Sequence, residues 1–370
     1  MSARFLTVVL ERAFNMRDGF GREIDYMRIS VIDSCNLNCY YCNPCDNNEH
    51  CHALNILSVK EVLGIVRAAT RLGIKHFRLT GGEPLLHPQL DEMVLQIKKI
   101  PGVSSVSLTT NAVLLVQHAK WLKEAGIDSI NVSLDTIDAS EYERITKKTL
   151  FEEVKHGINA AIECGIRVKI NVVLTPQTDV VALTRYVAKK GTDIRFIEMM
   201  PVGEGHTNGV EPYKKVIGTL SKLYGEPCRI NTEKTKEINS GNDKRKIPDN
   251  GPAEYYIFPE LGIRVGLIQA IHGKFCDTCN RIRVTADGRL MPCLGSSVTM
   301  DLVPDSWDFA DDVEKDFSIV RALRAAIKAK PRCHNFNDNA VTYTKTTETK
   351  TTEIEAAEVN AARNMSRIGG

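Results

Sequence analysis

The stretch Ser34-Cys35-Asn36-Leu37-Asn38-Cys39-Tyr40-Tyr41-Cys42 decides most about this chain, because it places three cysteines in one short loop. Thiolates with this C-x3-C-x2-C spacing can converge on a single soft metal centre. An iron–sulfur cube usually takes four cysteines, so three would leave one iron without a protein ligand. An open iron can hold a small molecule, and the spacing therefore predicts chemistry at the metal. The alternatives are a structural zinc site with a distant fourth ligand, or free thiols.

A second motif, Thr80-Gly81-Gly82-Glu83-Pro84, directly follows the strand-like run Lys75–Leu79. Paired glycines let a main chain approach a ligand without interference from Cβ atoms, and the adjacent carboxylate can accept hydrogen bonds from an ammonium group. Together with the cysteine loop, this motif resembles the radical S-adenosylmethionine (SAM) superfamily. The resemblance implies that the open iron chelates the amino and carboxylate groups of SAM. Reduction of the cluster would then cleave SAM to methionine and a deoxyadenosyl radical.

Composition limits the size of the fold, the classes of binding partner and the cellular location that are compatible with this chain. The chain has 370 residues, 43% of them hydrophobic, which is enough for a large domain with an appendage. Its net charge of only +2 argues against bulk electrostatic binding to nucleic acid or to a membrane. The apolar run Phe5–Leu10 is too short to span a bilayer. Eleven cysteines in metal-like clusters, without a signal peptide, predict a reducing, cytoplasmic location. The mitochondrial matrix is the less favoured alternative.

From Met27 to about Met200, apolar runs alternate with amphipathic helical stretches. The clearest helix begins at Ser58, with Glu61 completing a capping box. Six strand–helix units imply a parallel sheet, either an open doubly wound sheet or an incomplete barrel. The resemblance favours an incomplete (β/α)6 TIM-like barrel in the α/β class. The expected strands are Arg28–Asp33, His76–Thr80, Ser105–Thr110, Ser129–Asp135, Arg167–Leu174 and Asp193–Met200.

Domain boundaries are expected where this alternation begins and ends. An N-terminal segment covers residues 1–24, the barrel 25–205, a smaller C-terminal α+β subdomain 206–330, and an extended tail 331–370. The subdomain is expected to contain a hairpin around Asp287-Gly288, because turn residues there separate two strand-like runs. Its other expected elements are the strands Tyr255–Ile257 and Ile263–Ile268 and a helix over Glu314–Lys328.

Polar or soft motifs follow several of the expected strands. In parallel α/β folds the carboxyl ends of the strands meet at one rim and form the site. A shared cavity at that rim is therefore predicted. Besides the cysteine loop and the Gly-Gly-Glu-Pro turn, its members are Thr109-Thr110-Asn111, Ser133-Leu134-Asp135 and Glu198-Met199-Met200.

A second cysteine set, Cys276, Cys279 and Cys293, has the spacing C-x2-C-x13-C. Again only three thiolates lie close in sequence, so a second open cluster and a structural zinc site are both compatible with the spacing. Arg281 and Arg283 alternate on the strand that follows, so both should point to one side. Two guanidinium groups beside an open iron suit a phosphate-bearing substrate.

At this point the resemblance narrows to the GTP 3′,8-cyclase family, which opens molybdenum-cofactor biosynthesis. It covers about Gly21 to Leu294 and the last few residues, and it includes both cysteine sets, Arg195-Phe196-Ile197-Glu198 and the terminal Gly369-Gly370. The resemblance implies two [4Fe-4S] clusters, ligated by Cys35, Cys39, Cys42 and by Cys276, Cys279, Cys293. It implies SAM contacts from Tyr41, Gly82, Ser133 and Met200. It implies GTP contacts from Arg28, Arg78, Thr109, Lys169, Arg281 and Arg283.

The family's reaction would convert GTP to (8S)-3′,8-cyclo-7,8-dihydroguanosine 5′-triphosphate. The guanine base would meet the open iron of the second cluster, the deoxyadenosyl radical would abstract the ribose 3′ hydrogen, and the sugar radical would attack C8. The implied partners are a flavodoxin- or ferredoxin-type electron donor and a downstream cyclic pyranopterin monophosphate synthase, and a homodimer is compatible. Arg367, Gly369 and Gly370 would enter the cavity and help order the radical step.

Two other functions compete with this one. The first is a radical SAM enzyme that modifies a peptide and carries an auxiliary cluster, although that class usually needs more C-terminal cysteines. The second is a zinc-stabilised binding module, which leaves the Gly-Gly-Glu-Pro turn unexplained. The loop after Cys42 also carries Cys45, His50, Cys51 and His52. A zinc site is the alternative for this set, but surface residues are expected, with both thiols dispensable.

Overall fold

The computed structural model describes residues 16–42, 55–201, 212–230, 251–296, 298–302, 312–334 and 336. Several residues named above lie outside this part of the chain. They are Cys45, His50, Cys51, His52, Arg367, Gly369 and Gly370.

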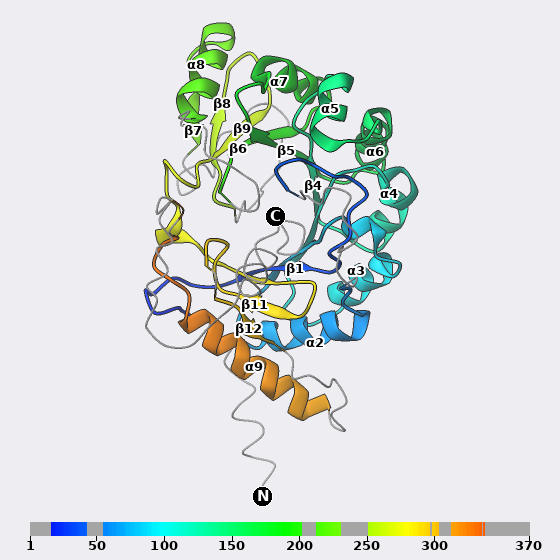
Figure 1. The fold of residues 1–370 in the computed structure, drawn as a ribbon, viewed down its shortest axis with the longest axis vertical. Coiled ribbons are helices and arrows are strands. Elements are labelled where there is room, and N and C mark those ends of the chain that lie inside the picture. Colours follow the sequence, from blue (N-terminus) through cyan, green and yellow to red (C-terminus); the bar gives the residue numbers. More distant parts are fainter. Residues whose placement is uncertain are drawn as a thin grey trace, which may run out of the picture.

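Six parallel strands lie side by side in chain order and form the centre of the fold. A doubly wound sheet would reverse its strand order, so the consecutive order confirms the incomplete (β/α)6 barrel. Helices surround the strands on the outer side (Figure 1). The strands are β1 (Tyr26–Ser30), β2 (His76–Thr80), β3 (Ser105–Thr110), β4 (Ser129–Ser133), β5 (Val168–Leu174) and β6 (Asp193–Glu198). The helices are α2 (Val59–Thr70), α3 (Leu90–Lys98), α4 (Leu115–Glu124), α5 (Ala139–Thr146), α6 (Phe151–Glu163) and α7 (Val180–Lys189), with the 3-10 turn η1 (Pro84–Leu86).

The C-terminal half extends both edges of this same sheet to twelve strands. At one edge, β10 (Arg281–Val284) pairs in parallel with β1 and continues into β11 (Arg289–Met291) and β12 (Met300–Asp301). At the other edge, β9 (Arg264–Ile268) pairs in parallel with β6, followed by β8 (Glu254–Ile257) and β7 (Cys228–Ile230). The strands assigned to a subdomain thus share the barrel's sheet, and a boundary near residue 205 stays a prediction.

The remaining C-terminal elements agree with the sequence patterns. The β10–β11 hairpin turns at Gly288, whose φ of 78° lies in the left-handed region that favours glycine. Helix α9 (Asp312–Lys328) covers the predicted segment and packs against α2 (Figure 1). Helix α8 (Pro212–Tyr224) and the 3-10 turn η2 (Cys276–Thr278) complete the described elements. None of the described helices is long and apolar enough to cross a membrane.

Local sequence explains how these elements form. At α2, the Ser58 amide donates to Glu61 Oε2 at 2.6 Å and the Glu61 amide donates to Ser58 Oγ at 3.3 Å, which confirms the capping box. Strand β1 departs from its expected bounds, since it begins at Tyr26 and ends at Ser30. The reason is tertiary: beyond Ser30 the chain leaves the ladder, and Ile32 forms an antiparallel bridge with Ile56.

The two faces of the barrel strands differ in chemistry. On β1, Met27 and Ile29 are fully buried in the hydrophobic core beneath the helices. Tyr26 and Arg28 alternate with them and face the barrel interior instead. The other strands follow the same alternation, so the fold presents a polar inner wall to one central space.

Candidate active site

A cavity of about 680 Å³ occupies the barrel interior. Its wall is built from every second residue of the parallel strands, and most of these residues carry hydroxyl, amide or cationic groups. All sixteen predicted site residues that the structure describes line this one cavity. They are Cys35, Cys39, Cys42, Tyr41, Gly82, Ser133, Met200, Arg28, Arg78, Thr109, Lys169, Arg281, Arg283, Cys276, Cys279 and Cys293.

The first cysteine set follows the carboxyl end of β1 and packs against the Gly-Gly-Glu-Pro turn. An added Cβ at Gly82 would lie 2.1 Å from the main-chain oxygen of Ser34, so only glycine fits this close approach. Cys35, Cys39 and Cys42 are free thiols. Burial raises the pKa of Cys35 to about 11 and that of Cys42 to about 12, so assembly of a metal cluster here must release protons. Three soft donors in one loop suit an iron–sulfur cluster with an open position.

Two carboxylates, the buried Glu83 and the half-buried Asp135, hold the loops around this set in place. Glu83 accepts hydrogen bonds from Thr110 Oγ1 at 2.6 Å and from the Asn111 amide at 2.7 Å, and burial raises its pKa to about 7. Tyr41 donates its hydroxyl proton to Asp135 Oδ2 at 2.5 Å, and Asp135 also accepts from the Val173 amide at 2.7 Å. The cysteine loop is thereby tied to the ends of β4 and β5.

Three arginines form a row across neighbouring strands in the middle of the cavity. The strand register pairs Arg28 with Arg283 on β10 and with Arg78 on β2. Adjacent strands lie about 4.8 Å apart, so three guanidinium groups crowd one buried wall. Burial, together with the charges of Arg283 and Arg78, holds the pKa of Arg28 well below its usual value. Burial and Arg281 lower the pKa of Arg283 to about 10.

Without a bound ligand, the three guanidinium groups of this row destabilise one another, because like charges repel more strongly away from water. A polyanion in the cavity would offset that repulsion. The neighbouring Tyr26 responds to the same field: burial would raise the pKa of its hydroxyl, but Arg78 and Arg28 lower it overall. The cavity therefore has an electrostatic preference for several negative charges close together, as in a triphosphate.

The second cysteine set lies at the opposite end of the same strands. Cys276 and Cys279 precede β10, which runs parallel to β1, whereas the first set follows β1. Burial alone would raise the pKa of Cys279, but the charges of Lys330 and Arg281 lower it overall. Cys228 on β7 and Cys333 are exposed, and neither lines the cavity. Among the described residues, the cavity wall therefore offers this set three thiols and no fourth one.

Sequence reasoning missed several residues of the cavity wall. Asn131 and Asn171 line it with amide oxygens that are buried and have no hydrogen-bond partner among the described residues. Such groups indicate a polar ligand. Arg195 also lines the wall, and its Nε donates to Tyr255 Oη at 2.6 Å. The signal for Asn131 and Asn171 was their spacing of two from Ser133 and Lys169 on the same strands, whereas Arg195 stood in the quoted motif Arg195-Phe196-Ile197-Glu198 without an assigned role.

One predicted member of the rim has a different role. Glu198 does not line the cavity. Its carboxylate accepts from the Ile271 amide at 2.7 Å, from the His272 amide at 3.2 Å and from the His272 ring. Glu198 therefore holds the loop after β9 against the end of β6.

Comparisons with known proteins agree with this geometry. Residues 29–182 match the radical SAM superfamily, and residues 192–336 match a family described as Molybdenum Cofactor Synthesis C. GTP 3′,8-cyclase of Clostridium perfringens (strain SM101 / Type A) is 35% identical over 87% of this chain and 95% of its own length. That of Pelotomaculum thermopropionicum is 36% identical over 86% of this chain and 95% of its own.

A solved structure shares the fold. Streptococcus suis SuiB bound to S-adenosylmethionine aligns with a TM-score of 0.54 over 81% of this chain and 65% of that one, at 14% identity. This likeness shows the architecture alone. The extent and identity of the curated relatives show more, and the two family matches, over residues 29–182 and 192–336, include both cysteine sets. The chain belongs to the GTP 3′,8-cyclase family of radical SAM enzymes.

Proposed function

We propose that this protein converts GTP to (8S)-3′,8-cyclo-7,8-dihydroguanosine 5′-triphosphate, the first step of molybdenum-cofactor biosynthesis. The observation that carries the proposal is the row formed by Arg283, Arg28 and Arg78 between two cysteine sets in one cavity. A nucleoside triphosphate would place clustered negative charge against this row of positive charge. Family membership supports the same substrate, because the curated relatives are GTP 3′,8-cyclases.

The first cysteine set would hold a [4Fe-4S] cluster whose open iron binds SAM. When reduced, this cluster supplies the electron that cleaves SAM to methionine and a deoxyadenosyl radical. The protein's part is to orient SAM and exclude water. The glycine at position 82 lets the cysteine loop pack directly against the turn, and the hydrogen bond between Tyr41 and Asp135 steadies that loop. The residues assigned to SAM are Tyr41, Gly82, Ser133 and Met200.

The second set would hold another [4Fe-4S] cluster, whose open iron receives the guanine base. The two sets lie at opposite strand ends of one cavity. A nucleotide between them would span the arginine row with its triphosphate, and its ribose would face the adenosyl group of SAM, as hydrogen abstraction at C3′ requires. Because the protein would hold SAM at one end of the cavity and the guanine base at the other, the reaction would not need a strong general base. The residues assigned to GTP are Arg28, Arg78, Thr109, Lys169, Arg281 and Arg283.

The proposed function also implies partner proteins, a cellular location and a role for the C-terminal tail. A flavodoxin- or ferredoxin-type protein would deliver electrons, and a cyclic pyranopterin monophosphate synthase would consume the product. Free thiols at both sets suit the reducing conditions of the cytoplasm. A homodimer is compatible with the proposal. The tail residues Arg367, Gly369 and Gly370 would enter the cavity, where glycines fit a narrow channel.

The deciding experiment is anaerobic reconstitution with iron and sulfide, followed by incubation with SAM, a reductant and GTP. The expected product is the cyclised nucleotide. Cys39→Ser should abolish deoxyadenosine formation, whereas Cys279→Ser should keep it and lose cyclisation. Zinc in place of iron, or deoxyadenosine without any GTP-derived product in the wild-type protein, would refute the proposal. The latter result would favour the peptide-modifying alternative.

A further inference from the structure

Two buried cations, Arg22 and Lys330, contact the main chain around the second cysteine set. Neither belongs to the arginine row. Arg22 is 9% exposed and Lys330 is 2% exposed. Arg22 lies on the N-terminal loop before β1, and Lys330 follows α9. Neither is assigned to SAM or GTP above, yet each is held deep inside the protein, where a charged group needs specific partners.

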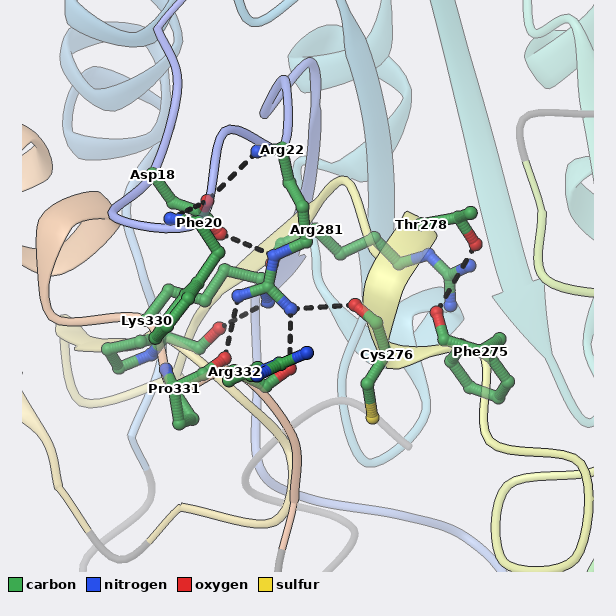
Figure 2. Close-up of polar contacts among 11 residues, drawn as sticks. Asp18, Phe20, Arg22, Phe275, Cys276, Thr278, Arg281, Lys330, Pro331 and Arg332 are labelled. Atoms are coloured by element: carbon green, nitrogen blue, oxygen red, sulfur yellow. Dashed lines mark hydrogen bonds and ion pairs between the residues drawn. The ribbon is translucent and has the colours of Figure 1, made fainter.

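Arg22 fixes the main chain at the first cysteine of the set. Its Nη1 donates to the carbonyl oxygen of Cys276 at 2.6 Å and to that of Arg332 at 2.9 Å, while Nη2 donates to Pro331 O at 2.6 Å. The Cys276 sulfur points away from the guanidinium group (Figure 2). Asp18 holds Arg22 in place, because its Oδ2 accepts from Arg22 Nε at 2.5 Å. The contact therefore orients the peptide and leaves the thiol available.

Lys330 fixes the main chain beside the other two cysteines. Its Nζ donates to Arg281 O at 2.7 Å and to Pro292 O at 2.9 Å. Arg281 lies two residues after Cys279, and Pro292 directly precedes Cys293. Each of the three cysteine-bearing segments thus has one carbonyl held by one of the two cations. Lys330 also lines the cavity, so its charge lies at the proposed cluster.

We propose that Arg22 and Lys330 are positioning residues of the second iron–sulfur cluster. They hold the three cysteine-bearing segments at the spacing that the cluster needs, and Lys330 places a positive charge beside the thiolates. This inference rests on the proposed function, which puts a cluster on this set. Outer partners commonly orient metal ligands in this way, and nearby charge and hydrogen bonds set the reduction potential of a cluster.

The test compares reconstituted variants by iron content and by electron paramagnetic resonance during a redox titration. Lys330→Met and Arg22→Met should each bind about four irons per chain where the wild type binds about eight. Both should still form deoxyadenosine from SAM, which shows that the protein and its first cluster are intact. Lys330→Gln keeps hydrogen-bond donors without the charge. It should keep the second cluster but shift its potential to a more negative value.

Lys328→Met and Arg17→Met are matched controls, because both side chains are exposed and lie close in sequence to the two cations. They should behave as the wild type. Full iron content and an unshifted potential in Lys330→Met and Arg22→Met would overturn the inference. So would loss of both clusters together in all three variants, which would make the role a general structural one. If the wild type itself binds only about four irons, the proposed second cluster fails, and that result is distinguishable from a failure of the positioning role.

Discussion

Arg28→Met should make the protein more stable and less able to bind GTP. Arg28 is the middle member of the row, with Arg283 on one side and Arg78 on the other. Methionine keeps much of the buried volume and removes the charge. We therefore expect the free energy of unfolding to rise in the absence of nucleotide, while the dissociation constant for GTP rises as well.

The magnitude follows from the spacing of the charges. Two unit charges on neighbouring strands repel by about 2–4 kcal/mol at an effective dielectric constant of about 20. Arg28 has two such neighbours, and the loss of its own polar contacts costs about 1–3 kcal/mol. With the weaker repulsion a net gain of about 2 kcal/mol remains, which raises Tm by about 2–3 °C for a chain of this length. A lost charged hydrogen bond to phosphate, worth about 1.5–3 kcal/mol, weakens GTP binding by about ten- to a hundredfold.

Differential scanning calorimetry without nucleotide and equilibrium GTP binding test both halves. Arg28→Lys should keep most of the repulsion and therefore show little gain in Tm. Arg324→Met, on the exposed side of α9, is the surface control and should change neither quantity. A lower Tm for Arg28→Met combined with unchanged GTP affinity would refute the reasoning, because the arginine would then serve the fold rather than the ligand.

Three further predictions concern the first cysteine set. Gly82→Ala should lower Tm and the iron bound by this set, because the new Cβ would lie 2.1 Å from a main-chain oxygen of the cysteine loop; the open position Gly218 in α8 is the control, where alanine should stabilise by about 1 kcal/mol. Tyr41→Phe should lower stability by about 1–3 kcal/mol in thermal unfolding, since it removes a donor from the half-buried Asp135; an unchanged Tm would contradict this. Burial raises the pKa of Glu83 to about 7, so its carboxyl gains a proton as pH falls through that value. A protonated carboxyl accepts hydrogen bonds from the SAM ammonium group less well. Relative to its value well above pH 7, the dissociation constant for SAM should therefore rise by about tenfold at about pH 6, and Glu83→Gln should abolish this pH dependence.

The local features of the protein could be read from the sequence. The two cysteine sets, the Gly-Gly-Glu-Pro turn, the capping box of α2 and the strand alternation depend on residues close together in the chain. Period-two alternation also predicted that Arg281 and Arg283 face one side, and both line the cavity. The structure and the relatives confirm the barrel and the family. The individual contacts assigned to SAM and GTP stay predictions.

Tertiary structure alone decided how the distant parts combine. Strand β10 pairs with β1 across some 250 residues of sequence, and only that register puts Arg283 beside Arg28. Arg22 reaches the carbonyl of Cys276 across 254 positions. The buried amide oxygens of Asn131 and Asn171 gain their significance from the cavity around them. Local spacing determines which side of a strand a residue occupies, but the neighbours of that strand depend on how the whole chain buries its apolar surface.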